Sequence, residues 1–338
     1  MIFGEIPVDE AEGCVLAHSL LVGGVRWPKG RVLQAADLDA LRGTGITSVV
    51  AARLEPGDVS EDAAATHIGA AVAGGGLTFS TATTGRINLH AAANGLVVID
   101  TAGVNRLNAV AEAVTLATVA PFQPVAVGTM VATIKIIPFA VPAAVLTACL
   151  PPSPLLRVAP WRGLKAGLLQ TRVAGTKDSV LAKTTEATAR RLEACGATLV
   201  SEDRCPHRTA DVAVALKTLR ASGCDLVLMV GASAISDRAD VLPSAVVDVG
   251  GRIDHLGMPV DPGNLLMLAE WDGLPVLGLP GCARSPKLNG ADWVLWRLAA
   301  GLPVTRADIM GMGVGGLIAD VPGRPMPRAR ASANVGRS

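Results

Sequence analysis

Tyrosine is absent from the 338-residue sequence, and the aromatic residues together make up only 3% of it. Half of the residues are hydrophobic, and much of that half is alanine and valine. We therefore expect pockets walled by aliphatic side chains and backbone, not by stacked aromatic rings. Charge is also scarce, because 17% of the residues are charged and the net charge is +1. Proteins that bind nucleic acid usually carry a basic excess, so this balance disfavours a nucleic-acid partner.

The six cysteines lack the spacing of a metal site or of a disulfide framework. None forms a C-x-x-C pair, and Cys205 and His207 have no neighbours that complete a zinc set. Reduced thiols, as in cytosolic proteins, are the expected state. The N-terminal segment lacks the apolar stretch of a signal peptide, and no uncharged apolar run reaches the roughly 18 residues of a membrane helix. We expect a soluble, cytoplasmic protein with no membrane partner.

Signatures of several enzyme classes are also missing. No G-x-S-x-G or H-E-x-x-H sequence occurs, so serine-hydrolase and zinc-peptidase activities lack their usual marks. The glycine run 74–76 has neither the preceding strand nor the lysine of a phosphate-binding P-loop, and a flexible turn is the simpler interpretation.

Proline marks a boundary near the middle of the chain. Three prolines lie among residues 151–154 and Pro160 follows, a composition typical of a link between domains. We predict an α+β domain over residues 1–155 and an α/β domain over 156–318. Residues 319–338 are rich in proline, arginine and serine, which predicts a disordered basic tail.

Strand and helix signals alternate along the second half of the chain. Short apolar runs predict strands at 164–171, 197–202 and 224–230, and a hairpin within 264–281 around an Asp-Gly turn. Amphipathic segments predict helices at 178–196, 209–223, 236–250 and 285–301. Strands separated by helices predict a mostly parallel sheet covered on both sides. The first half is mixed, with helices expected at 36–43 and 61–76 and a strand within 127–141.

The loop after the strand 224–230 is the first candidate site. In an open parallel sheet, ligands bind beyond the carboxyl ends of the strands. Gly231, Ala232 and Ser233 are small enough for a ligand to approach the backbone. A helix that begins near Ser236 would point its free N–H groups at this loop, which favours an anion such as phosphate.

Charged residues follow within the same loop. Arg238 is placed to pair with the phosphate, and Asp237 and Asp240 suit a divalent cation such as Mg²⁺ held against it. A purely structural role is the alternative, in which Ser236 or Asp237 caps the helix and Arg238 pairs with Asp240 on the surface. The residues alone leave both interpretations open.

A second loop carries cations just before the last predicted helix. Pro280 and Gly281 end a strand, and Arg284, Ser285 and Lys287 follow. Because acids are preferred at helix starts, two cations and a hydroxyl there indicate an anion site, with a solvated basic turn as the alternative.

Three ordered segments together resemble a known domain. Within residues 165–301 the chain contains "VGASAISDRAD", then "MPVDPGNLLML", a turn stiffened by Pro262 and Gly263, then "GLPGCARSPKLNG". In this order and spacing they resemble the molybdopterin-binding (MoaB/Mog-like) domain of molybdenum cofactor biosynthesis proteins. The segments "IPVDEAEGCVLAHSL" and "KGRVLQAADLDALRGTGITSVV" are similar to parts of molybdopterin molybdenumtransferases. The whole chain resembles a bacterial subgroup of molybdopterin-binding proteins.

This resemblance implies a fold, a ligand and a set of site residues. The fold is a three-layer α/β/α domain, and the ligand is a small-molecule pterin phosphate, molybdopterin or its adenylylated form. The implied metal-insertion residue is Asp237, with Asp240 as a looser match, and both are the expected catalytic and metal-binding residues. The expected ligand-binding residues are Thr171, Gly231, Ala232, Ser233, Ser236, Arg238, Pro262, Gly263, Pro280, Gly281, Arg284, Ser285 and Lys287.

The chain also departs from the family pattern. Ala232 replaces the second glycine of the loop, and Arg172 and Val173 replace an acidic pair of the transferases. Three functions therefore stay open. The first is a molybdenumtransferase that inserts molybdate, and the second is a non-catalytic carrier or regulatory module that serves a molybdoenzyme or other cofactor-assembly proteins. The third is an unrelated enzyme of sugar or nucleotide phosphates. Family members commonly self-associate, so a homo-oligomer is a further expectation.

Overall fold

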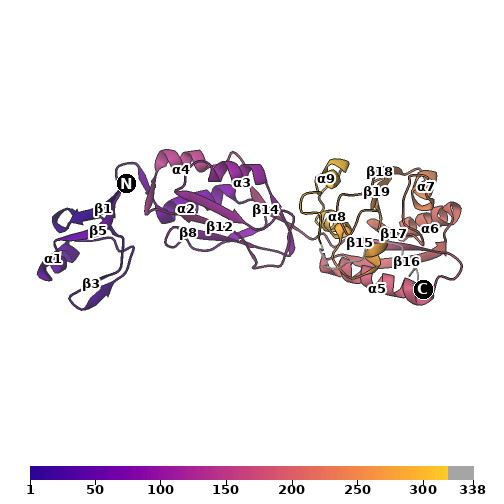
Figure 1. The fold of residues 1–338 in the computed structure, drawn as a ribbon, viewed down its shortest axis with the longest axis horizontal. Coiled ribbons are helices and arrows are strands. Elements are labelled where there is room, and N and C mark those ends of the chain that lie inside the picture. Colours follow the sequence, from indigo (N-terminus) through magenta and orange to yellow (C-terminus); the bar gives the residue numbers. More distant parts are fainter. Residues whose placement is uncertain (319–338) are drawn as a thin grey trace, which may run out of the picture. The chain divides into compact units, whose positions relative to one another are not determined.

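The computed structural model describes residues 1–318, which form two compact units (Figure 1). The first unit is Met1–Pro160, and the second begins at Trp161. Each unit encloses its own clusters of buried apolar side chains. The tail expected at 319–338 lies outside the described residues.

The first unit opens with a small β-rich fold. Its sheet has the order β1-β5-β2, formed by β1 (Ile2–Pro7), β5 (Ser48–Arg53) and β2 (Val15–Leu16). The hairpin of β3 (Leu20–Val22) and β4 (Val25–Trp27), the 3-10 turn η1 (Val8–Glu10) and helix α1 (Ala35–Gly43) complete it. Leu33 and Leu41 are fully buried in its core.

Antiparallel sheets and three helices form the rest of the first unit. One sheet has the order β10-β12-β8-β7, formed by β10 (Val114–Thr118), β12 (Met130–Ile136), β8 (Arg86–Ala91) and β7 (Leu77–Phe79). A three-stranded sheet has the order β11-β9-β14, formed by β11 (Pro124–Val125), β9 (Gly95–Ile99) and β14 (Leu156–Pro160). A two-stranded sheet pairs β13 (Ala140–Pro142) with β6 (Asp58–Ser60). The helices are α2 (Glu61–Val72), α3 (Thr101–Asn108) and α4 (Ala143–Cys149).

A six-stranded, mostly parallel sheet is the centre of the second unit. Its order is β16-β15-β17-β20-β19-β18. The strands are β15 (Lys165–Arg172), β16 (Thr198–Pro206), β17 (Leu226–Val230), β18 (Arg252–Leu256), β19 (Met267–Trp271) and β20 (Leu274–Gly278). The strands β16, β15, β17 and β20 run parallel, whereas β19 is antiparallel to both of its neighbours. This arrangement confirms the expected α/β class with a mostly parallel sheet.

Helices cover both faces of this sheet (Figure 1). Side chains of β17 alternate, so that Leu226 and Leu228 pack with α5 (Asp178–Ala194) and α8 (Gly290–Ala299). Val227 and Met229 pack on the other face with α6 (Thr209–Ala221) and α7 (Val241–Asp248). All of β17 is buried, because a strand covered on both faces has no side exposed to water. A short helix, α9 (Arg306–Met310), follows α8.

Two predicted helices begin later than expected. The helix expected at 236–250 begins at Val241, and the one expected at 285–301 begins at Gly290. The prediction of a helix start near Ser236 is therefore wrong. The backbone N–H of Ser236 donates to the Asp240 carboxylate, which folds the segment into a turn. Before α8, Pro286 disfavours helical backbone at the residue that precedes it.

Among residues 1–318, no helix combines the length and the apolar character that crossing a bilayer requires.

Candidate functional site

The buried hydroxyl of Thr171 joins two loops at the carboxyl ends of the parallel strands. Thr171 is the next-to-last residue of β15 and has no exposed surface. Its Oγ1 accepts the backbone N–H of Ala232 at 2.8 Å and lies 2.8 Å from His207 Nδ1. The expected site residue Thr171 therefore contacts the expected loop after β17.

His207 belongs to this site although the sequence pattern gave it no role. It follows β16, which extends to Pro206, whereas the expected strand ended at residue 202. The longer strand carries His207 to the same edge as Thr171, because the carboxyl ends of parallel strands meet there. The polar run Ser201–Arg204 carries no strand signal, so the sequence contains no local sign of His207.

The loop after β17 makes its sharp turn at Gly231. A Cβ atom on Gly231 would lie 2.4 Å from the carbonyl oxygen of Ser233, a distance that no side chain tolerates. The carbonyl oxygen of Gly231 accepts a hydrogen bond from Arg284 Nη2 at 2.9 Å. Ser233 is exposed. The turn thus brings the backbone of Ala232 beside Thr171 and the carbonyl of Gly231 beside Arg284.

Asp240 holds the next part of the loop together. Its Oδ2 accepts the backbone N–H of Ser236 at 2.6 Å, the Ser236 hydroxyl at 3.1 Å and the backbone N–H of Asp237 at 3.0 Å. These backbone hydrogen bonds lower the pKa of Asp240 because they favour the ionised carboxylate. Asp240 therefore stabilises the loop, and the N–H groups that we expected to be free for an anion have a partner.

Asp237 and Arg238 point to different partners. Asp237 Oδ1 accepts the backbone N–H of Ala239 at 2.8 Å. The Arg238 guanidinium donates to the carbonyl oxygen of Ile253 on β18 at 3.1 Å. The side chain of Arg238 is thereby directed toward the edge strand of the sheet.

Arg284 is a partly buried cation at this edge of the sheet. It ends the 3-10 turn η2 (Gly281–Arg284), which follows Pro280 after β20. Its Nη1 donates to Thr184 Oγ1 and its Nη2 to the carbonyl of Gly231, both at 2.9 Å. Burial lowers the pKa of Arg284, and no carboxylate in the described part of the chain opposes that shift. A desolvated guanidinium without a counter-ion attracts an anion.

Helix α5 begins close to this cation. Residues 173–177 connect β15 to α5, and no side chain caps the first turn of the helix. Asp178 and Ser179 both lie inside the helix and so do not cap it. Thr184, the partner of Arg284, lies in the second turn of α5. Arg284 therefore contacts α5 within two turns of the helix start, where the positive end of the dipole favours negative charge.

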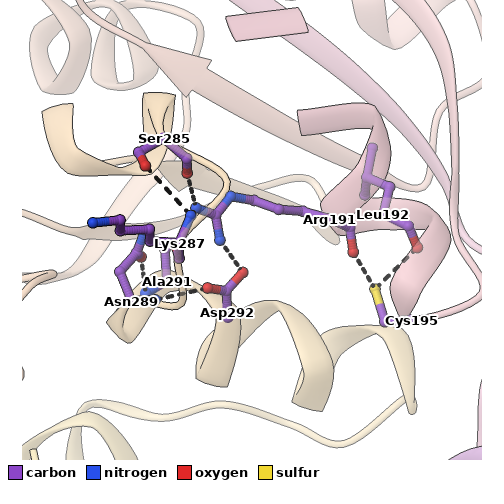
Figure 2. Close-up of polar contacts among 8 residues, drawn as sticks. All are labelled: Arg191, Leu192, Cys195, Ser285, Lys287, Asn289, Ala291 and Asp292. Carbon is purple, nitrogen blue, oxygen red and sulfur yellow. Dashed lines mark hydrogen bonds and ion pairs between the residues drawn. The ribbon is translucent and has the colours of Figure 1, made fainter. Parts of the chain in front are cut away.

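The backbone that follows Arg284 is held from α5 (Figure 2). Arg191 donates to the carbonyl oxygen of Ser285, to that of Lys287 at 2.8 Å, and to the carboxylate of Asp292. Arg191 and Asp292 are both buried. Arg191 thus holds Ser285 and Lys287, which we expected to bind the ligand, through their backbone carbonyl groups.

The start of α8 is closed to ligands. The Gly290 N–H donates to the carbonyl of Pro262 at 2.8 Å, and the Ala291 N–H donates to Asn289 Oδ1 at 2.8 Å. A Cβ atom on Gly263 would lie 2.8 Å from the nitrogen of Gly290, so this turn packs directly against the helix start. Pro262 and Gly263 therefore contact the start of α8.

Three cavities lie in the second unit, and Pro286 and Leu288 of the segment before α8 line one of them. Cavities of about 370 and 400 Å³ share Asp225, near the amino end of β17. The third, of about 300 Å³, lies between α5 and α8 and is lined in part by Arg191 and Trp296. None of these three is lined by the expected ligand-binding residues.

No group of three or more His, Cys, Asp or Glu side chains in residues 1–318 is placed to hold a metal ion. Burial raises the pKa of the Cys205 thiol to about 11, which keeps it protonated near neutral pH. The pairing of Cys205 with His207 in a metal site, already doubtful from the sequence, has no support in this geometry.

Comparison with known proteins gives one family match and several distant likenesses. Residues 5–53 match the model of a domain of unknown function, DUF8806. No curated protein matches the chain.

Three similar solved structures come from cofactor biosynthesis. The molybdopterin biosynthesis enzyme MoaB of Thermus thermophilus is 19% identical, with a TM-score of 0.30, over 41% of this chain and 98% of that chain. The molybdopterin biosynthesis protein MoeA of Pyrococcus horikoshii is 11% identical, with a TM-score of 0.31, over 89% of this chain and 76% of that chain. The tungsten cofactor synthesizing protein MoaB of Pyrococcus furiosus is 13% identical, with a TM-score of 0.24, over 40% of this chain and 92% of that chain. The chain thus has a distant structural resemblance to molybdopterin biosynthesis proteins.

Proposed function

We propose that this protein binds molybdopterin in molybdenum cofactor biosynthesis, with the phosphate of the ligand at the carboxyl edge of the β16-β15-β17-β20 strands. The observation that carries the proposal is Arg284, a partly buried cation with no carboxylate partner among residues 1–318. A guanidinium binds phosphate through paired N–H groups, and burial strengthens that attraction. The order of the three loop segments, which resembles the molybdopterin-binding domain, supplies the identity of the ligand.

Other parts of the same edge complete the proposed binding site. The uncapped start of α5 adds N–H groups and a positive dipole end. The Gly231–Ala232 turn lies at the same edge, where Thr171 fixes its direction and its small residues leave room for the ligand. Small and aliphatic side chains around the turn suit a pterin that is bound through its phosphate and its edges.

A divalent cation fits this edge less well than the phosphate does. Asp240 Oδ2 already accepts three hydrogen bonds, and Asp237 Oδ1 accepts one. The second oxygen of each carboxylate is not used in these loop hydrogen bonds, so Mg²⁺ would need phosphate oxygens and water to complete its shell. If the cation is present, Asp237 and Asp240 are the residues that would hold it.

The hydrogen bonds that Asp237 and Asp240 accept within the loop favour a carrier over a molybdenumtransferase. Both carboxylates that would serve metal insertion stabilise the loop backbone. Arg172 and Val173 stand where the transferases carry acids. A carrier would deliver the bound pterin to a molybdoenzyme or to another cofactor-assembly protein.

Binding is tested by titrating the purified protein with molybdopterin in a calorimeter. We expect a dissociation constant below about 100 μM, equivalent to roughly −5 kcal/mol. Arg284→Met should weaken binding at least tenfold, because a charge-assisted hydrogen bond contributes about 1.5–3 kcal/mol. Arg190→Met, which removes an exposed guanidinium paired with Glu186, is the matched control and should bind normally. Equal affinity of Arg284→Met, or tighter binding of a nucleotide or sugar phosphate, would overturn the proposal.

Catalysis is tested separately by following molybdate incorporation into bound molybdopterin. A carrier binds the pterin without raising the incorporation rate, and this is the expected outcome. If the wild-type protein does accelerate incorporation, Asp237→Asn should abolish the acceleration and spare binding. Acceleration that survives in Asp237→Asn would remove the catalytic role of Asp237.

A further inference from the structure

Arg191 is a buried charged side chain with contacts to a loop about a hundred residues away in sequence (Figure 2). It extends from α5 into the segment between η2 and α8, where it reaches two carbonyl groups and one carboxylate. Its side chain is 8% exposed and that of its partner Asp292 is 5% exposed. The segment it contacts follows directly after Arg284, the cation of the proposed phosphate site.

Helix α5 contacts this segment at two points on one face. Thr184 Oγ1 accepts from the Arg284 side chain, and Arg191 donates to the carbonyls of Ser285 and Lys287. Residues seven positions apart lie on the same face of a helix and are separated by about 10 Å along its axis. The helix therefore fixes both the guanidinium of Arg284 and the backbone that carries it.

Stability alone is a weak reason for this arrangement. Burying an ion pair costs desolvation, and apolar residues of similar size often stabilise a fold equally well. The pair is also not fully satisfied, because Arg191 Nε has no hydrogen-bond partner in the described chain. What arginine offers, and an apolar side chain does not, is a planar set of donors that can hold two carbonyls and a carboxylate at once.

We propose that Arg191 is a positioning residue that holds Arg284 in its phosphate-binding geometry through the backbone of residues 285–287. This inference rests on the proposed function, since it assigns Arg284 to the phosphate. Arg191 itself does not touch the ligand.

The test compares Arg191→Lys with Arg190→Lys, a neighbouring exposed control on the same helix. Lysine keeps the charge beside Asp292 but lacks the fork that holds both carbonyls. In Arg191→Lys we expect faster amide hydrogen exchange in residues 284–289 and a loss of molybdopterin affinity of about tenfold, the size of one charge-assisted hydrogen bond. Arg190→Lys should leave both measurements unchanged.

The two readouts separate this inference from the proposed function. Hydrogen exchange needs no ligand, so it reports whether Arg191 holds residues 284–289 even if wild-type protein binds no molybdopterin. That binding result would overturn the proposed function and the assignment of Arg284 to the phosphate, but not the hold of Arg191 on the loop. If the wild type binds and Arg191→Lys binds equally well, the positioning role is wrong. It is also wrong if exchange rises evenly throughout the second unit, because that pattern indicates global destabilisation.

A second variant covers the case in which Arg191→Lys fails to fold. The double change Arg191→Met with Asp292→Asn leaves no unpaired buried charge, and asparagine can still accept the N–H of Asn289 that caps α8. We expect a folded protein with fast exchange in 284–289 and weakened binding. Wild-type exchange and affinity in this variant would contradict the proposal.

Discussion

At the scale of single residues, the loop after β17 depends on glycine at position 231, which has no Cβ atom. In Gly231→Ala, the new methyl group would meet the Ser233 carbonyl at 2.4 Å, so the turn must shift. We expect a loss of about 1–3 kcal/mol in unfolding free energy, as in other overpacked sites, and weaker ligand binding, measured by denaturant unfolding and calorimetry. Gly75→Ala, in the first unit, is the control, because a Cβ there has no atom within 4 Å. Equal effects of the two substitutions would contradict this account of the turn.

The Asp240 carboxylate gives a second residue-scale prediction, in the pH dependence of stability. The pKa of Asp240 in the folded protein lies below the ordinary value of 3.8 for an aspartate, so folding favours the ionised form. The stabilisation is fully present above that value and is lost as the pH falls through the lower folded pKa. We therefore expect wild-type protein to be more stable than Asp240→Asn near neutral pH, with the difference shrinking below about pH 4 in denaturant titrations. A difference that does not change with pH would count against this assignment.

Several site residues can be identified from sequence, and others cannot, for a physical reason. Small residues and charges that follow a buried strand mark the Gly231 loop and Arg284 directly. His207 and Arg191 have no such local mark, because their roles come from contacts distant in sequence. Arg191 meets Asp292 only after the sheet is assembled, across 101 residues of chain.

At the scale of elements, apolar periodicity located most strands and helices of the second unit but missed β18 and α9, and a side-chain cap marks where α8 begins. Asn289 sets the start of α8, since its Oδ1 accepts the Ala291 N–H. Asn289→Ala should lower the unfolding free energy by about 0.5–2 kcal/mol, the usual cost of a lost cap. Asn289→Ser, which keeps an acceptor at the cap, should recover most of the loss in the same thermal or denaturant unfolding measurement. If serine and alanine are equally destabilising, the cap is not what holds α8.

At the scale of the whole molecule, the pairing of β14 decides where the first unit ends. Residues Leu156–Pro160 pair with β9, so a fragment of residues 1–160 keeps that sheet intact and a fragment of residues 1–155 loses its edge strand. We expect cooperative thermal unfolding by circular dichroism for 1–160, and a lower midpoint or no transition for 1–155. The fragment from Trp161 onward should fold alone and keep molybdopterin binding. Identical melting of the fragments 1–155 and 1–160 would show that β14 contributes nothing to the first unit.

The Thr171 hydroxyl has a further consequence for the chemistry of the edge. Because it accepts the Ala232 N–H, its own proton is available to His207 Nδ1, and in that arrangement both the Ala232 N–H and the Thr171 hydroxyl have an acceptor. The neutral imidazole then carries its proton on Nε2 and presents a donor, not a lone pair, to its surroundings. Nitrogen chemical shifts of His207 would therefore show the Nε2–H tautomer in wild-type protein and a mixture in Thr171→Val.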